Sequence, residues 1–305
     1  MISKIKNAAG LLKSTAFAWS DDNVSMMSGS LAYSTVFSIA PLLVIAIAVA
    51  GFVFGEQASN GQIFKGINDL IGADGAEAIQ AMVKSSAQRP NTGIFATLVG
   101  IVTLVVGASN AFQQLQQSLN MIWKVRLKST HSFWALVHKR LLTFSMVLVI
   151  AFLLLVSLIL TTFIAALGEF LGNRLPGGEV FWHVVNAALS FGVTTVLFAA
   201  IFKILPDVKL IWKDVWIGGV VTAFFFTVGK FLIGLYLGHS SVSSSYGAVG
   251  SLVVFLLWVY FSTAILLYGA EFTRLYATRN GKVVPPVEEA ELYSIQAAPS
   301  LDKKT

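Results

Sequence analysis

Long apolar segments alternate with short polar ones along most of the chain, and this pattern predicts its elements. The longest apolar run, Tyr246–Phe272, holds 27 residues and a single charge, Glu271, near its end. A helix rises about 1.5 Å per residue, so about 20 apolar residues cross a bilayer core about 30 Å thick. Helices buried inside soluble proteins rarely extend this far without a polar stripe. The run therefore predicts a transmembrane helix.

Apolar segments of the same character recur five more times, so the pattern predicts six membrane spans. Pro41 removes a backbone donor from the first span, which predicts a kink near Phe37–Pro41. In the last span, Gly247, Gly250 and Gly269 let neighbouring helices approach closely. The predicted fold class is all-α, a polytopic membrane protein. The membrane domain covers residues 28–272, with spans at about 28–54, 92–111, 141–167, 180–205, 215–237 and 246–272.

The N-terminal segment has the periodicity of an amphipathic helix. Apolar residues in 2–19 recur every three or four positions, and Lys4, Lys6 and Lys13 lie mostly off that stripe. This pattern predicts a helix within a cytoplasmic segment, residues 1–27. The helix lies either on the membrane surface, with its lysines near anionic headgroups, or packed against the protein.

Two further polar segments flank the predicted spans. Residues 55–90 contain short apolar helical faces separated by a break at Asp74-Gly75, which predicts a helical outer loop that caps the membrane domain. Residues 273–305 form a polar cytoplasmic tail that contains Pro285-Pro286. This tail is predicted to be disordered beyond about residue 284.

The composition supports a membrane protein and excludes several kinds of site. The chain is 56% hydrophobic and 12% charged, about half the charge of a soluble domain. Without cysteine, it offers no disulfide, thiolate nucleophile or cysteine-ligated metal. His131 and His138 lack a third ligand nearby, so no metal site and no cofactor are predicted.

The positions of the basic residues predict the orientation. With the N-terminus inside, lysine and arginine number three in the N-terminal segment, five in the second-to-third loop, three between the fourth and fifth spans, and five in the tail. Only four lie in the outer loops. This bias predicts an N-in, C-in protein of the bacterial inner membrane and explains the net charge of +6 without nucleic acid.

Lys230 is the one basic residue predicted inside a span. A charge at that depth is costly and favours a functional role. Glu271 is predicted about 24 Å away in depth, too far to pair with it. Lys230 either meets an anionic substrate, bonds to carbonyls in the bundle or extends toward the outer surface. The first reading gives a hypothetical substrate pathway lined by Lys230, Tyr33, Ser38, Ser190 and Asn186. Ser38 also suits a structural role, in which its hydroxyl satisfies a backbone carbonyl freed by the kink at Pro41.

Glu271 lies near the inner end of the last span, three residues before Arg274. An ion pair at this spacing is the structural interpretation. A carboxylate that couples transport to a proton or another ion is the functional one.

Several segments together resemble the YihY/BrkB family of bacterial inner-membrane proteins. They are SGSLAYSTVFSIAPLL (28–43), the Asn120-x-x-Trp123 segment, ILPDVKLIWKDVWIGG (204–219) and SYGAVGSLVVFLLWVYFSTAILLYGAEF (245–272). The resemblance covers about residues 10–280 and implies a six-span membrane protein. Some members carry a virulence-factor label and others the name ribonuclease BN. The matching motif residues, none with a catalytic role that the resemblance supplies, are Ala32, Tyr33, Ser38, Pro41, Pro206, Gly247, Trp258, Gly269 and Glu271.

The residues themselves argue against an enzyme. A metal-dependent nuclease needs clustered carboxylates or histidines on the aqueous side, whereas the cytoplasmic segments offer Asp21, Asp22, Asp207 and Asp214 without histidine partners. No GxxxxGK[ST] loop is present to bind ATP phosphates. We therefore predict no enzymatic activity and no nucleic-acid partner.

Two functions remain from the sequence. The first is a transporter or permease, with an anionic or amphipathic solute as the candidate substrate. The second is a non-transporting scaffold or envelope-integrity factor that binds lipid or protein partners. The predicted partner in both is the lipid bilayer, with a homo-oligomer as a further option.

Overall fold

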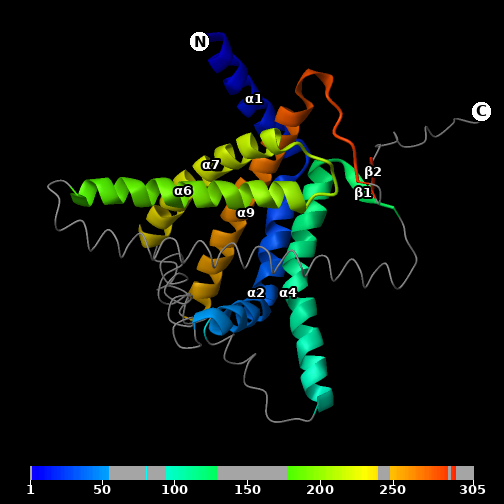
Figure 1. Ribbon diagram of the computed structural model, residues 1–305, viewed down its shortest axis with the longest axis vertical. Coiled ribbons are helices and arrows are strands. Elements are labelled where there is room, and N and C mark those ends of the chain that lie inside the picture. Colours follow the sequence, from blue (N-terminus) through cyan, green and yellow to red (C-terminus); the bar gives the residue numbers. More distant parts are fainter. Residues whose placement is uncertain are drawn as a thin grey trace, which may run out of the picture.

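The computed structural model describes residues 2–54, 80, 94–128, 178–239, 248–287 and 290–292, and these are mostly helical (Figure 1). A two-stranded antiparallel sheet and one turn of 3-10 helix, η1 (Arg279–Gly281), complete the described elements. The long helices are α1 (Ile2–Asp21), α2 (Val24–Phe54), α4 (Ile94–Ile122), α6 (Gly178–Ile204), α7 (Trp212–His239) and α9 (Ala248–Thr278). The strands are β1 (Val125–Leu127) and β2 (Ala290–Leu292).

Three of the described helices contain a stretch long and apolar enough to cross a membrane. These stretches are Ala187–Ile204 in α6, Trp212–Ile233 in α7 and Val253–Thr278 in α9. They overlap the predicted fourth, fifth and sixth spans, although the second begins before residue 215 and the third ends after residue 272. The predicted span at 141–167, and the outer loop at 55–90 apart from residue 80, lie outside the described residues. Six spans and the N-in, C-in orientation therefore stay predictions.

α2 and α4 each extend beyond one end of the spans predicted at 28–54 and 92–111. α2 begins at Val24 and α4 continues to Ile122, through a segment rich in serine, asparagine and glutamine. α2 changes direction along its length, as expected for a helix that contains Pro41 (Figure 1). Ser34 Oγ and Thr35 Oγ1 donate to carbonyls one turn earlier in the same helix, at 2.9 and 2.8 Å.

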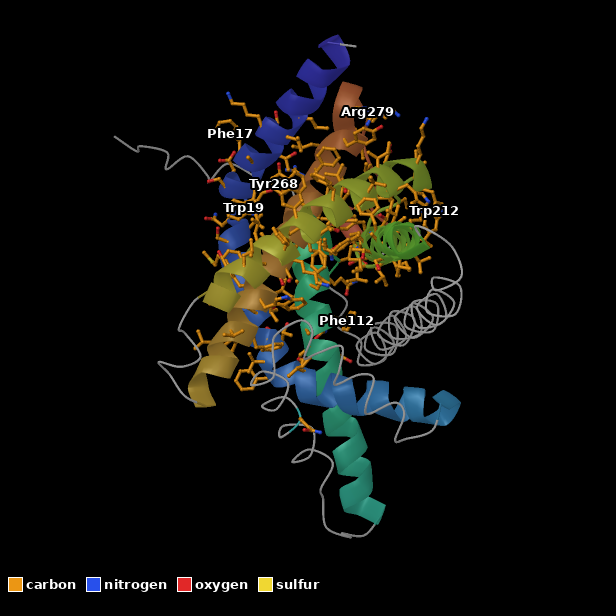
Figure 2. All side chains as sticks on the ribbon, turned by 90° about the vertical axis from the view of Figure 1, so that its left-hand side faces the viewer. Phe17, Trp19, Phe112, Trp212, Tyr268 and Arg279 are labelled. Atoms are coloured by element: carbon orange, nitrogen blue, oxygen red, sulfur yellow. The ribbon has the colours of Figure 1, made fainter. Side chains whose placement is uncertain are left out.

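The helices pack as two neighbouring groups that share α9. α2 packs against α4 and α9, whereas α7 packs against α6 and α9 (Figure 1). α1 lies along the C-terminal half of α9, where Tyr268 Oη donates to the Leu12 carbonyl at 3.1 Å (Figure 2). α9 therefore packs against α1, α2, α4 and α7.

α7 and α9 approach so closely that two glycines are required. A Cβ built on Gly218 would lie 1.9 Å from Thr273 Oγ1, and one built on Gly269 would lie 1.9 Å from Thr222 Oγ1. Each threonine lies four residues after the glycine of its own helix and donates to that glycine's carbonyl, at 2.7 Å for Thr222 and 2.6 Å for Thr273. The arrangement is reciprocal and antiparallel. The predicted role of Gly269 in close packing thus has a specific partner.

The ends of α1, α4, α6 and α9 meet at one end of the molecule. There, α1 leads into α2, α4 leads into β1 and α6 leads into α7 (Figure 1). Alternating spans would bring the segments predicted as cytoplasmic to one side in this way. The buried apolar core of this end includes Val24, Leu119, Ile122, Phe202, Leu205, Val215 and Leu267.

Residues 282–287 and 290–292 of the C-terminal tail fold back onto this end, and the rest of the segment predicted to be disordered beyond about residue 284 lies outside the described residues. β2 pairs with β1 in the register Arg126 opposite Glu291, and these two side chains form an ion pair of 2.8 Å. Before β2, the Lys209 amide donates to the Pro285 carbonyl and the Val287 amide to the Asp207 carbonyl. The polar composition of the tail did not predict these contacts, because the hydrogen-bond partners lie far away in the sequence.

The α7–α9 contact predicts that Gly269→Ala destabilises the protein. The added methyl group overlaps a β-branched side chain already fixed by its own hydrogen bond, so we expect a loss of about 1–3 kcal/mol. Thermal unfolding in detergent measures the effect. Gly192→Ala on α6 is the control, because nothing lies within 4 Å of its added Cβ. Equal melting temperatures for the two variants would contradict the required close approach.

Candidate functional site

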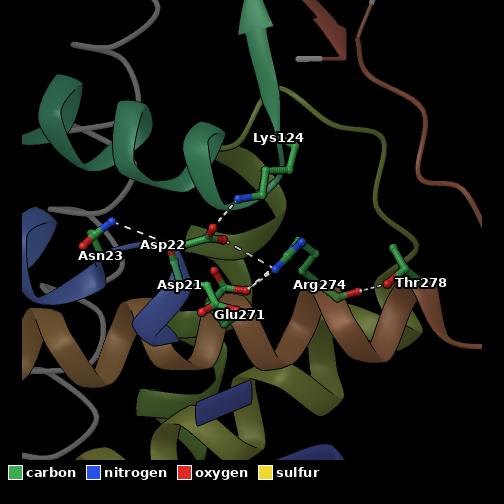
Figure 3. A network of polar contacts seen from close by, with 7 residues as sticks. All are labelled: Asp21, Asp22, Asn23, Lys124, Glu271, Arg274 and Thr278. Atoms are coloured by element: carbon green, nitrogen blue, oxygen red, sulfur yellow. Dashed lines mark hydrogen bonds and ion pairs between the residues drawn. The ribbon is translucent and has the colours of Figure 1, made fainter. Parts of the chain in front are cut away.

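Four charged side chains from three segments meet where α1, α4 and α9 converge. Asp22 follows α1, Lys124 follows α4, and Glu271 and Arg274 lie one turn apart on α9 (Figure 3). Left-handed backbone conformations at Asn23 (φ 53°) and Lys124 (φ 55°) end the two helices at this point. We call these four residues the charge cluster.

Arg274 joins the two carboxyl groups of the charge cluster. Its Nη2 and Nε donate to Glu271 Oε2 at 2.7 and 3.1 Å, and Nη2 lies 3.6 Å from Asp22 Oδ2 (Figure 3). Lys124 Nζ donates to Asp22 Oδ1. The structure thus contains the Glu271–Arg274 ion pair expected from sequence, within a larger network.

Burial differs sharply within the charge cluster. The Glu271 side chain is 0% exposed, compared with 13% for Asp22, 20% for Arg274 and 35% for Lys124. A buried charge is stable only when it is paired and hydrogen-bonded. The burial gradient therefore places Glu271 in the least favourable position for a negative charge.

Asp22 is held in its ionised form. Burial acts to raise the pKa of Asp22, but its close contact with the Glu271 carboxyl group lowers it. The hydrogen bond from Lys124 and the charges of Lys124 and Arg274 lower it further, so the pKa lies below its ordinary value. Asp22 is therefore the anion of the cluster at neutral pH.

Two buried oxygens of the cluster receive no N–H donor. Asp22 Oδ2 and Glu271 Oε1 lack a donor among the residues that the structure describes. Buried polar atoms normally have a partner, so each such atom needs an explanation.

A pocket of about 470 Å³ opens beside Asp22. Its wall combines apolar surface with two acidic and two basic side chains. Residues at the end of α4 line this pocket and are therefore accessible from the surface. The lining residues are Asp21, Asp22, Met27, Met121, Lys124, Val125 and Arg126.

A second set of polar side chains holds the turn that connects α6 to α7 against the end of α4. Asn120 Nδ2 donates to Asp207 Oδ2 at 2.6 Å, and the Asp207 amide donates to Asn120 Oδ1 at 2.9 Å. Gln116 Nε2 adds longer contacts of 3.2 and 3.4 Å to the same carboxylate. Asn120 belongs to a motif noted in the sequence, and its role here is to hold a turn.

The residues of the hypothetical substrate pathway lie on three helices. Tyr33, on α2, is 66% exposed, and Ser38 of the same helix is buried with no partner for its Oγ in the described structure. Ser190 is exposed on α6, which also contains Asn186, and Lys230 is exposed on α7. The main contacts of α2 are with α4 and α9, whereas α6 packs on α7. The shared pathway remains a prediction.

The structure revises the estimated distance between Lys230 and Glu271. Gly229 lies against Ile265, so Lys230 is level with a position about seven residues from Glu271. That spacing corresponds to about 10 Å along the helix axis rather than 24 Å. The sequence estimate was too large because it assumed that the two spans end at the same level, whereas the first turns of α9 extend past the end of α7. Lys230 still forms no ion pair within the described part of the chain.

The other predicted structural residues mostly occupy helix interiors. Pro41 lies in α2, Gly250 in α9, and Gly247 is outside the described residues. Trp258 is half-buried and packs against a small cluster of Ala32, Phe255 and Val259 between α2 and α9. These positions suit helix packing.

Asp22 and Lys124 are functional candidates that sequence reasoning missed. Asp22 was noted only as an acid in a cytoplasmic segment, and Lys124 only as part of a basic loop. The available signal was their position, because each directly follows a long helix. Within the described residues, no group of three or more histidine, cysteine, aspartate or glutamate side chains is close enough to bind a metal.

The paired geometry of Asn120 and Asp207 predicts that Asn120→Ala is destabilising. Hydrogen bonds to a charged group contribute about 1.5–3 kcal/mol, and this variant leaves a carboxylate without its closest donor. Thermal unfolding measures the loss. Gln117→Ala, at an exposed position on the same helix, is the control. A loss no greater than that of the control would contradict the role of Asn120.

The lowered pKa of Asp22 predicts an acid-dependent contribution to stability. A carboxyl group whose pKa is lowered by folding stabilises the native state above its ordinary pKa, and this contribution disappears as pH falls through the lowered value. We expect wild type to be more stable than Asp22→Asn near pH 7, with the difference shrinking below about pH 4. Melting curves across this range test it, with Asp21→Asn as control. A difference independent of pH would contradict the assignment.

Comparison with known proteins supports the resemblance noted in the sequence. Curated relatives described as UPF0761 membrane proteins include one from Pseudoalteromonas translucida, 25% identical over 88% of this chain and 86% of its own length. Others come from Pseudomonas aeruginosa (28% identical, 82% of this chain, 58% of the relative) and Teredinibacter turnerae (29%, 90% and 63%). The chain thus spans less than two thirds of the length of several relatives. No solved structure matches it.

The family comparison covers nearly the whole chain. The model of the family described as virulence factor BrkB matches residues 16–291, a range that includes all four members of the charge cluster. This chain is therefore a membrane protein that belongs to the BrkB family.

Proposed function

We propose that this chain is a transporter or permease of the bacterial inner membrane. The observation that supports the proposal best is the presence of charged side chains inside helices that are long and apolar enough to cross a membrane. Lys230 lies within Trp212–Ile233, and Glu271 and Arg274 lie within Val253–Thr278. Charges at such positions are costly in a bilayer and commonly belong to substrate or ion pathways.

The surroundings of Lys230 favour an amphipathic anion as the solute. Lys230 is exposed between Val228 and Phe231, which are exposed apolar residues of the same helix, as is Leu232. No carboxylate pairs with Lys230 among the described residues. An ammonium group on an apolar surface matches a solute that carries both a negative charge and an apolar portion.

The alternative function is a non-transporting scaffold that binds lipid or protein partners. The charge cluster supports this alternative, because the positive charges of Lys124 and Arg274 balance the two acidic residues locally. Such compensation also suits a structural junction between helices.

Solute flux into liposomes distinguishes the two functions. We expect wild-type protein to carry at least one member of a panel of inorganic anions, cations and short-chain anionic lipids, and Lys230→Met to abolish that flux. Lys213→Met is the matched control, because it removes a lysine from the exposed beginning of the same helix. Flux that survives in Lys230→Met would remove this lysine from the pathway. Absence of flux in wild type would favour the scaffold.

A further inference from the structure

The charge cluster contains a contact between two carboxyl groups that ordinary pairing does not explain. Arg274 Nη2 lies 2.7 Å from Glu271 Oε2 and 3.6 Å from Asp22 Oδ2, so the two carboxyl groups lie close together. Asp22 Oδ2 and Glu271 Oε1 are also the two buried oxygens that lack an N–H donor in the described structure. A hydrogen bond between carboxyl groups requires a proton on one of them.

Electrostatics gives the same requirement. Two carboxylates that share a buried site repel each other, so the pair retains one proton under conditions in which isolated acids are ionised. Arg274 reaches both groups but does not separate them, since its Nη2 lies 2.7 Å from Glu271 Oε2 and 3.6 Å from Asp22 Oδ2.

The environment decides which residue carries the proton. Asp22 is bonded to Lys124 and partly exposed, which stabilises its negative charge. Glu271 is completely buried within an apolar helix, where the neutral form is favoured. A protonated Glu271 still accepts from Arg274 through Oε2 while Oε1 donates to Asp22.

We propose that Asp22 and Glu271 form a proton-binding site, in which Glu271 Oε1 carries the proton and donates it in a hydrogen bond to Asp22 Oδ2. The pocket of about 470 Å³ beside Asp22 provides access for exchange with water. Asp22 lines that pocket whereas Glu271 does not, so the proton reaches and leaves Glu271 past Asp22.

The charged surroundings of this site come from a few elements. α2 and α4 contain no charged residue, so the positive charge on this side of the site comes from Lys124, just after α4. On α7, Lys213 and Asp214 lie near this end and form no ion pair with the cluster among the described residues. α1 contributes the exposed Lys13 and Asp21, and α9 contributes Tyr268, Arg274 and Tyr276.

Loss of the proton would weaken the junction of three segments. Asp22 belongs to the turn between α1 and α2, is held by the end of α4, and contacts α9. When Glu271 is ionised, the contact that joined the turn to α9 becomes a repulsion between two carboxylates. Binding of the proton is thereby linked to the packing of α1 and α4 on α9. This inference holds whether or not the chain transports a solute.

Infrared spectroscopy of the purified full-length protein in lipid tests the proposal directly. At neutral pH, we expect wild type to show the carbonyl stretch of a protonated carboxylic acid, which shifts in D₂O and disappears as pH is raised. Glu271→Gln should lack the band and Asp22→Asn should displace it, while the exposed neighbour variant Asp21→Asn should retain it unchanged. The proposal is overturned if wild type lacks the band or Glu271→Gln retains it.

The dependence of stability on pH gives a second, independent readout. A proton bound by the native state and absent from the unfolded state lowers stability as pH rises, by up to tenfold in the unfolding equilibrium constant per pH unit. We expect this loss to begin above about pH 4, where a glutamate of the unfolded chain ionises, and to end once native Glu271 has released its proton, in wild type and Asp21→Asn but not in Glu271→Gln. Glu271→Gln retains a donor toward Asp22, so it should fold at neutral pH. Failure to fold, or an unchanged pH dependence, would contradict the site. A negative flux assay leaves both measurements unaffected.

Discussion

A positive charge shared between two acids holds together the end of this protein where four helices converge. Arg274 extends from the apolar α9 helix and contacts both Glu271 and Asp22, while Lys124 completes the neutralisation of Asp22. Buried charges are tolerated only when matched locally. Asp22 is matched by both Lys124 and Arg274, and this pairing ties the α1–α2 turn and the end of α4 to α9.

Close helix packing provides the frame on which that charge arrangement depends. The reciprocal contacts of Gly218 with Thr273 and of Gly269 with Thr222 fix the register of α7 on α9. Gly269 and Thr273 flank Glu271 on the same helix, so the packing contact and the charge cluster occupy opposite aspects of one helical turn. Each threonine hydroxyl donates to a carbonyl of its own helix, so neither needs a donor or acceptor from the neighbouring helix.

Local sequence patterns predicted the apolar helices and the pairing of Glu271 with Arg274, because both depend on spacing within one segment. They did not predict the contacts of Asp22 with Lys124 or of β2 with β1, since these partners are separated by 102 and about 165 residues. Periodicity carries no information on such pairs. The depth of Lys230 relative to Glu271 was misjudged for a related reason, because the shift of α9 along α7 depends on contacts between the two helices and not on the apolar length of either.

The order in which the chain is synthesised gives the tail strand β2 a particular consequence. Asp22 emerges early, its partner Lys124 follows, and Arg274 and β2 come last. Until the final helix enters the bilayer, Asp22 has only part of its neutralising environment and β1 has an unpaired edge. The surface around β1 is thus completed late in synthesis, because it requires Arg274 and β2, which follow all the other described helices.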